Sequence, residues 1–201
     1  MSSAQVRIGL VAKKAATCTL CRLYRHATQT VFGEGPPGAA IMMVGEQPGD
    51  QEDLAGHPFV GPAGKLLDRA MAEAGLDRRK VYLTNAVKHF KNEPRGKKRL
   101  HKLPNRFEVE VCRVWLCQEI DIVRPKLILA LGVTAAAALA GRPVVLSKER
   151  GKMIAFSDDR RGMVTVHPSS ILRMPDQAAR HAALAALVKD LTAALKQAAA
   201  A

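Results

Sequence analysis

The stretch Ala39-Ala-Ile-Met-Met-Val-Gly45 decides the class of fold, because it is a short, almost wholly apolar run that stops at a glycine. Such a run is typical of a strand that is buried on both faces of a sheet, as strands of parallel sheets are. Three more runs of this kind follow along the chain, at residues 81–87, 126–132 and 163–166. Together they predict a central sheet of four parallel strands, although periodicity alone does not exclude short buried helices.

Helical patterns separate these strands. Residues 63–74 follow Pro62 and stop at Gly75, which is a favourable start and stop for a helix. Further helices are expected at residues 105–122, 133–140 and 176–198. Strands that alternate with helices predict an α/β fold with three layers, αβα, and we expect one domain over residues 1–201.

The charge of the chain indicates the kind of partner. Its 201 residues contain 31 Lys and Arg against 18 Asp and Glu, which gives a formal net charge of +13 and a pI near 10.0. A compact domain this basic favours a polyanion, and nucleic acid is the leading candidate because neutralised phosphates release counterions. A merely soluble cationic surface is the alternative.

The sequence contains no apolar run near the ~20 residues that span a bilayer. Its first residues lack the apolar core of a signal peptide, so we expect a cytoplasmic protein without membrane association. In a reducing compartment the four cysteines are not expected to form structural disulfides.

Polar and glycine-rich segments follow the predicted strands. They are residues 45–50, 88–91, 132–134 and 167–170. In α/β folds, sites form beyond the carboxyl ends of the strands. We therefore expect these segments to collect on one rim and to form an active site there.

Four side chains on or near this rim are candidates for chemistry. Glu46 could stabilise developing positive charge or orient a water, or it could simply cap the next helix. Phe59 could stack on a base or pack in the core. Asn85 could pair with the edge of a pyrimidine or cap a turn, because an amide both donates and accepts. His167 could donate to a leaving-group oxygen or have a structural role.

The segment 88–102 is strongly basic, with seven Lys or Arg among its fifteen residues. Pro94 and Gly96 favour a loop over a helix, and a solvated run of charge is the ordinary explanation. His101 lies within this segment. A neutral imidazole is a competent nucleophile and nearby cations favour the neutral form, although a histidine in such a segment is more often a phosphate contact or a bystander.

Cysteine spacing indicates a metal site. Cys18 and Cys21 form a C-x2-C pair, and Cys112 lies on the helix expected at 105–122. Either His89 or Cys117 could be a fourth ligand. Thiolates suit both zinc and an iron–sulfur cluster, so the spacing does not choose between them.

Four motifs in order resemble the family 4 uracil-DNA glycosylases, and most closely their UdgX branch. The resemblance runs from Cys18 to Arg173 and rests on residues 45–49 (GEQPG), 56–61 (GHPFVG), 84–88 (TNAVK) and 167–170 (HPSS). It implies a glycosylase-like fold and a [4Fe-4S] cluster held by Cys18, Cys21, His89 and Cys112. His89 stands where family 4 has a cysteine, and Cys117 is then a spare thiol.

The resemblance also implies roles around the basic loop, residues 88–104. Residues 97–101 look like an insertion of the UdgX branch, in which a histidine joins covalently to the abasic sugar. This implies that His101 attacks C1′ of the deoxyribose, with Glu46 and His167 as its catalytic partners. Uracil would be bound by Gln47, Asp50, Phe59 and Asn85, and DNA by Lys97, Lys98, Arg99, Ser169 and Arg173.

The expected partner is uracil-containing DNA, preferably single-stranded, bound by a monomer. Two other functions remain open. The chain could be a glycosylase with multiple turnovers whose loop only grips DNA, or a module that binds uracil-containing DNA without chemistry. A nucleotide-binding protein is more remote, because neither a Walker nor a Rossmann fingerprint is present.

Overall fold

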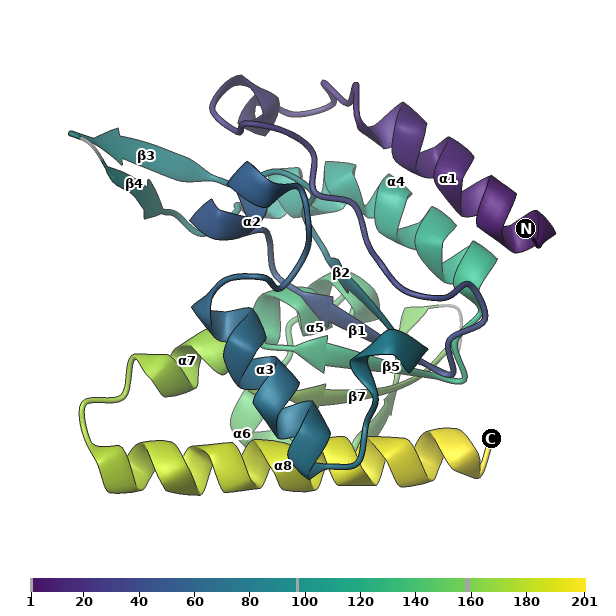
Figure 1. The fold of residues 1–201 in the computed structure, drawn as a ribbon, viewed down its shortest axis with the longest axis vertical. Coiled ribbons are helices and arrows are strands. Elements are labelled where there is room, and N and C mark those ends of the chain that lie inside the picture. Colours follow the sequence, from purple (N-terminus) through teal and green to yellow (C-terminus); the bar gives the residue numbers. More distant parts are fainter. Residues whose placement is uncertain (1, 97, 158–159) are drawn as a thin grey trace.

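The computed structural model describes residues 2–96, 98–157 and 160–201, and it has a three-layer αβα architecture (Figure 1). The strands of the central sheet lie in the order β2-β1-β5-β7-β6. Four of these strands are parallel: β1 (Ile41–Gly45), β2 (Val81–Asn85), β5 (Leu127–Leu131) and β7 (Arg161–Thr165). They match the four apolar runs, so the predicted fold class is confirmed.

The prediction of only four strands is wrong, because β6 (Met153–Ala155) joins the sheet as an antiparallel edge strand beside β7. It has three residues, and two of them are exposed. A strand so short and so little buried leaves no apolar run in the sequence.

Helices cover both faces of the sheet because alternate strand residues point to opposite sides. Ile41 and Met43 of β1 pack in one core, and Met42 and Val44 pack in the other. The first core is closed by α3 (Pro62–Glu73), α7 (Pro168–Leu172) and α8 (Gln177–Ala199). The second is closed by α1 (Ser3–Ala15), α4 (Arg106–Val123), α5 (Val133–Ala140) and α6 (Leu146–Glu149).

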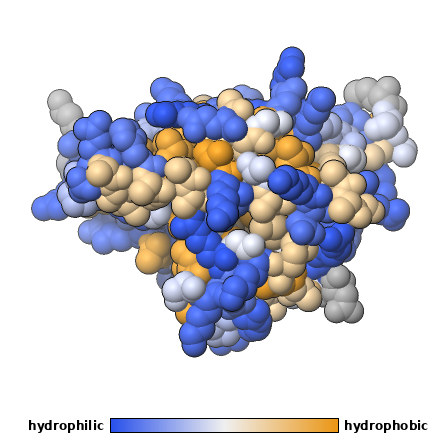
Figure 2. All heavy atoms as spheres, turned by 90° about the horizontal axis from the view of Figure 1, so that it is seen from below, coloured by the Kyte–Doolittle hydropathy of each residue, from blue (hydrophilic) through white to orange (hydrophobic). Residues whose placement is uncertain are grey.

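The four expected helices correspond to α3, α4, α5 and α8. The remaining short elements are α2 (Asp50–Ala55) and two 3-10 turns, η1 (Arg22–Arg25) and η2 (Arg78–Lys80). Figure 2 looks onto the face along which α8 runs, where hydrophilic and hydrophobic side chains are interspersed, while Leu184, Leu187 and Leu191 of α8 are buried. Among the described residues, no helix combines the length and the hydropathy needed to cross a membrane.

The basic segment forms a β-hairpin rather than an irregular loop. Strand β3 (Asn92–Arg95) pairs antiparallel with β4 (Lys98–His101), and the hairpin extends away from the central sheet beside α2 (Figure 1). Gly96 adopts a φ of 59° at the turn, a value that glycine reaches without strain. Charged residues and Pro94 hid this two-stranded ribbon from hydrophobic pattern analysis, because neither of its faces is buried in the core.

Candidate active site

The parallel strands place their following residues on a common rim. Glu46 follows β1, Asn85 ends β2, Gly132 follows β5, and His167 lies two residues after β7. The chain after β2 is tied to the chain after β1, because Ala86 N–H donates to Gly45 O (2.8 Å) and Val87 N–H donates to Glu46 O (2.9 Å). The expectation that these polar segments gather at one edge of the sheet is confirmed.

Gly45 creates the space in which two candidate base-binding side chains meet. A Cβ atom at this position would lie 2.3 Å from Asn85 Oδ1 and 2.7 Å from Phe59 Cζ. The amide of Asn85 and the ring of Phe59 therefore both reach over the backbone of Gly45. This brings a flat aromatic face and an amide together at the carboxyl end of β1.

The backbone of Phe59 is held in an unfavourable conformation. Its φ is 57°, in the left-handed region that non-glycine residues seldom adopt. The guanidinium of Arg78 donates to the carbonyl oxygens of Pro58 (3.1 Å) and Phe59 (3.3 Å). Glu52 accepts from Gly61 N–H at 2.7 Å. Strain that is fixed by so many contacts is typical of a functional loop.

Glu46 lies between a hydroxyl and an imidazole. Thr134 Oγ1 donates to Glu46 Oε2 at 2.5 Å, and His101 Nε2 lies 3.7 Å from Glu46 Oε1. The side chain of Glu46 is 18% exposed, whereas that of His101 is 48% exposed. The carboxylate is thus oriented by α5 on one side and faces the hairpin on the other.

Gln47 joins the rim to the hairpin and determines which nitrogen of His101 carries a lone pair. Gln47 Oε1 accepts from Lys91 N–H at 3.1 Å, so its Nε2 group must face Lys102 O and His101 Nε2, both at 2.9 Å. The amide can only donate from this side. His101 Nε2 therefore accepts, and its lone pair is directed at the Gln47 amide.

The electrostatics of the site favour a neutral His101. Partial burial lowers its pKa, Glu46 opposes this effect, and the positive charge of Arg173 adds to it. The ring of Phe90 packs 6.0 Å from that of His101. A neutral imidazole with a lone pair on Nε2 is the protonation state that a nucleophile requires.

His167 begins α7 as its N-cap. Its Nδ1 accepts from Ser169 N–H at 3.2 Å and lies 2.8 Å from Ser169 Oγ, so the remaining proton of the neutral ring is on Nε2. Burial, assisted by the positive charge of Arg173, lowers the pKa of His167 to about 4. The ring lies 6.3 Å from that of Phe59. His167 is therefore a neutral donor on the rim.

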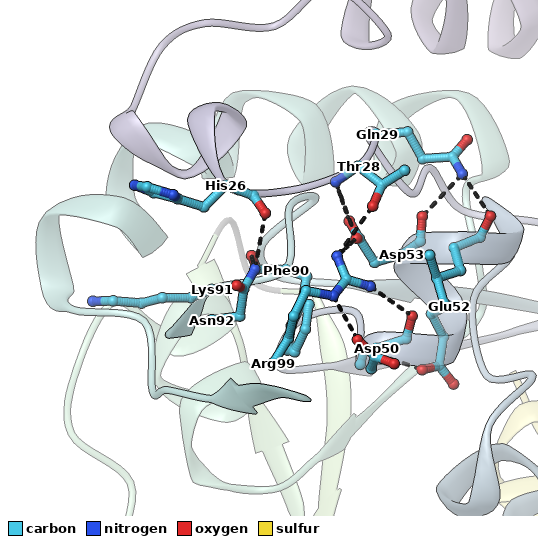
Figure 3. A network of polar contacts seen from close by, with 12 residues as sticks. His26, Thr28, Gln29, Asp50, Glu52, Asp53, Phe90, Lys91, Asn92 and Arg99 are labelled. Carbon is cyan, nitrogen blue, oxygen red and sulfur yellow. Dashed lines mark hydrogen bonds and ion pairs between the residues drawn. The ribbon is translucent and has the colours of Figure 1, made fainter. Parts of the chain in front are cut away.

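Arg99 anchors the hairpin to α2 (Figure 3). Its guanidinium donates to Asp53 Oδ2 (2.5 Å), Asp50 Oδ1 (2.7 Å) and Thr28 Oγ1 (3.1 Å). It also lies 5.4 Å from the centroid of the Phe90 ring. Residues two apart on a strand share a face, so the contacts of Arg99 also orient His101. Asp50 was expected to bind uracil together with Asn85. In the structure it contacts Arg99, and these contacts do not include Asn85.

The other expected DNA contacts lie on two sides of the rim. Lys98 is exposed at the end of the hairpin, and Arg173 donates to Ser169 Oγ at 3.1 Å near His167. Lys97 lies outside the described residues. The surface that surrounds the rim is therefore basic on both the hairpin and the α7 side.

Three thiols gather between the N-terminal segment and α4. Cys21 and Cys112 pack in one buried cluster with Leu23 and Val87, and Cys18 is also buried. Burial raises the pKa of Cys112 to about 12, against the opposing effects of the Lys88 charge and of the Lys88 backbone N–H. Cys112 Sγ accepts from Lys88 N–H at 3.2 Å, and Cys18 Sγ accepts from the Trp115 ring N–H at 3.2 Å.

The two candidates for a fourth ligand lie in different surroundings. His89 is buried and its Nε2 lies 2.9 Å from Thr30 Oγ1, while burial lowers its pKa against the opposing effect of Asp53. Cys117 lines a separate cavity with Leu139 and Phe156. Within the described ranges, no three or more His, Cys, Asp and Glu side chains are arranged around one metal ion.

Residues 32–192 match the uracil DNA glycosylase superfamily. The chain belongs to this superfamily. It is 37% identical over 165 residues to a type-4 uracil-DNA glycosylase of Thermotoga maritima, which covers 82% of each chain. It is 38% identical over 167 residues to a type-4 uracil-DNA glycosylase of Pyrobaculum aerophilum, which covers 79% of this chain and 81% of the relative. A type-4 uracil-DNA glycosylase of Archaeoglobus fulgidus is 34% identical over 174 residues.

The part that matches the superfamily contains the whole rim, from Glu46 to His167, and the hairpin. It begins after Cys18 and Cys21, which lie in the N-terminal segment. Sequence reasoning placed Thr134 on the rim but gave it no role. It also missed Asp53 and missed Glu119, whose carboxylate accepts from Thr84 Oγ1 (3.0 Å) next to Asn85. Asp53 and Glu119 could not have been found from sequence, because each lies on a helix far along the chain from the side chains that it contacts.

Proposed function

We propose that this member of the superfamily removes uracil from DNA. The observation that carries the proposal is the meeting of Asn85 and Phe59 over Gly45, next to the carboxylate of Glu46. An enzyme that acts on a base in DNA extrudes it from the stack into a pocket. Phe59 would stack on the extruded uracil, and the Asn85 amide would pair with its polar edge. The relatives named type-4 uracil-DNA glycosylases support this assignment.

Cleavage of the glycosidic bond leaves negative charge on uracil and positive charge on the sugar. The Nε2–H of neutral His167 is available to donate to the uracil oxygen on which the charge develops. Glu46, oriented by Thr134, would stabilise the oxocarbenium-like sugar. We also assign Asp50 to substrate binding, because it lies with Gln47 in the segment that follows β1.

The similarity to type-4 uracil-DNA glycosylases favours hydrolysis at the sugar, with multiple turnovers. In that reaction a water oxygen bonds to C1′, and Glu46 accepts the released proton before it passes to the uracil anion. The product is an abasic site, and the enzyme is free to act again.

Capture of the sugar by His101 is the second candidate, and it corresponds to the UdgX branch. The position of an unprotonated His101 Nε2, 3.7 Å from Glu46 Oε1, favours it. The C1′–N1 bond breaks with its electron pair on uracil, and the Nε2 lone pair forms a bond to C1′. The cationic ring then loses its Nδ1 proton through solvent to the uracil anion. Gln47 must release Nε2 for this step.

A denaturing gel and an assay of free uracil separate these outcomes. Both candidates predict release of uracil from a uracil-containing oligonucleotide and none from a thymine-containing one, because the 5-methyl group should be rejected sterically. Capture predicts a DNA–protein band that survives heat and detergent and is lost in His101→Ala. His101→Ser should then gain turnover, because it leaves Glu46 in place and makes room for water. Turnover by the wild type without a covalent band would exclude capture.

The basic surface is assigned to the DNA backbone. Lys97, Lys98, Ser169 and Arg173 would contact phosphates, with Arg99 contributing through the position of the hairpin. Single-stranded DNA is the preferred substrate in the proposal, because its bases need no unpairing before extrusion. We propose that the protein acts as a monomer.

The three buried thiols suit an iron–sulfur cluster in their donor chemistry. Each iron of a [4Fe-4S] cluster takes one protein ligand, so its ligands stand further apart than those around a single ion. Cys18, Cys21 and Cys112 would hold it with His89 as the fourth ligand. When bound, the cluster would tie the N-terminal segment to α4 as a structural element.

Iron content and visible absorption of anaerobically purified protein test the cluster. Both should fall more in His89→Ala than in Cys117→Ala, because Cys117 lines a different cavity. The reverse order would transfer the ligand role to Cys117. Stoichiometric zinc without iron would contradict the cluster itself.

A further inference from the structure

A fully buried ion pair lies beneath the candidate active site and has no part in the chemistry described so far. Lys88 Nζ lies 2.5 Å from Glu119 Oε2, and both side chains are 0% exposed. Removing two charges from water is costly, and apolar side chains of similar volume can often replace such a pair without loss of stability. Its presence therefore calls for a role beyond stability.

Both charged groups have their hydrogen bonds satisfied by named partners. The ammonium of Lys88 has three protons, and it donates to Glu119, to Thr84 Oγ1 (2.6 Å) and to Asn85 O (2.7 Å). Glu119 accepts in addition from Gly33 N–H (2.9 Å), Tyr82 OH (3.3 Å) and Thr84 Oγ1 (3.0 Å). The position of the ammonium is thus fixed by three acceptors.

The contact with Asn85 O takes the place of a hydrogen bond that a neighbouring strand would otherwise supply. β2 is at the edge of the sheet, so every second residue directs its backbone polar groups away from β1. Leu83 satisfies these groups by exchanging two hydrogen bonds with Glu34, at 2.9 and 2.7 Å. Asn85, two residues later, faces the same way, and its carbonyl oxygen accepts from Lys88. The ammonium therefore fixes the backbone at the point where the base-reading amide begins.

We propose that Lys88 and Glu119 are positioning residues that make the pocket selective for uracil over cytosine. The inference rests on the proposed function, in which the Asn85 amide reads the base. Uracil and cytosine present opposite donor and acceptor groups at N3 and C4, so one fixed orientation of an amide accepts only one of them. A loosened Asn85 backbone permits the amide to turn and pair with cytosine.

The test compares affinity for bases that cannot be excised. Single-stranded oligonucleotides with one 2′-fluoroarabino-uridine or one 2′-fluoroarabino-cytidine resist cleavage of the glycosidic bond, and fluorescence anisotropy gives the ratio of their Kd values. In Lys88→Met we expect the preference for uracil to fall by about tenfold, which corresponds to one net hydrogen bond.

Two further variants separate positioning from stability. The double variant Lys88→Met/Glu119→Leu removes both charges, so its urea midpoint should return towards that of the wild type while its uracil preference stays low. Arg150→Met is the control, since it breaks the partly buried Arg150–Asp190 pair (2.7 Å) beside β7, on the other side of the sheet from β2. It should lose stability and keep the preference.

The outcomes distinguish the inference from the function on which it rests. A double variant that regains the uracil preference, or a Lys88→Met protein that never loses it, would overturn the inference. A wild type without any preference for uracil would overturn the proposed function as well. Iron content and visible absorption are measured in every variant and the Kd ratios are compared at equal iron content, because both the backbone N–H and the charge of Lys88 act on Cys112.

Discussion

Arg99→Met should lower the stability of the fold and loosen the attachment of the hairpin to α2. The change keeps much of the apolar stem and removes the guanidinium that contacts Asp53, Asp50 and Thr28. Asp53 is 0% exposed and would keep only the backbone N–H of Thr28, at 3.0 Å from each carboxylate oxygen. The substitution therefore leaves a buried carboxylate without its cation.

The size of the effect follows from the burial of the two partners. Removal of one partner from a fully buried pair costs about 3–5 kcal/mol, whereas a surface pair contributes about 0–1 kcal/mol. The side chain of Arg99 is 23% exposed, and Asp50 is 48% exposed, so only the contact with Asp53 approaches the buried case. We expect a loss of about 2–3 kcal/mol in the free energy of unfolding.

Urea denaturation measures this loss, and limited proteolysis reports on the hairpin. Arg99→Met should unfold at a lower urea concentration and be cut faster within residues 92–101. Arg79→Met is the control, because its ion pair with Asp77 lies on the surface, and it should unfold like the wild type. Equal midpoints for Arg99→Met and Arg79→Met would refute the anchoring of the hairpin by this network.

Three other changes test separate parts of the site. The pKa of His167 is about 4 in the folded chain, so only the unfolded chain takes up this proton as the pH drops below about 6.5. Between about pH 6.5 and pH 4, the free energy of unfolding of the wild type should therefore fall by up to roughly 2–3 kcal/mol more than that of His167→Asn, as measured in urea. If the difference between the two proteins does not change with pH, the burial of a neutral ring is contradicted. Gly45→Ala places a methyl group on Asn85 and Phe59 and should abolish uracil release, and an active variant would show that the two side chains do not form the pocket. Lys98→Ala should reduce the log–log salt slope of DNA binding by about one, whereas Lys65→Ala on α3 should not, and equal slopes would remove Lys98 from the interface.

The sequence was sufficient for the parts of the fold that depend on local pattern. Four apolar runs each became a strand of the parallel sheet, because burial on both faces requires continuous hydrophobicity. Pro62 and the following pattern marked α3 correctly. The strand β6 was missed because edge strands of three residues carry no such pattern, and the hairpin was missed because neither of its faces lies in the core.

The residues that gather on the rim could be predicted from the sequence, but their side-chain contacts could not. The position of Glu46, Asn85 and His167 at the carboxyl ends of β1, β2 and β7 follows from topology alone. The tautomer of His101 depends on how Lys91 and Lys102 orient Gln47, and the pair between Lys88 and Glu119 joins residues 31 positions apart. Such contacts arise only from tertiary packing, so no spacing rule could have revealed them.

The most direct test of the central claim is release of the free base. The protein is incubated with a single-stranded oligonucleotide that contains one uracil, and with the same oligonucleotide containing thymine, and mass spectrometry follows free base and oligonucleotide mass. We predict free uracil and loss of the base from the first oligonucleotide only, with Asn85→Ala and Glu46→Ala greatly slowed. An intact uracil-containing oligonucleotide after prolonged incubation with cluster-loaded protein would contradict the account.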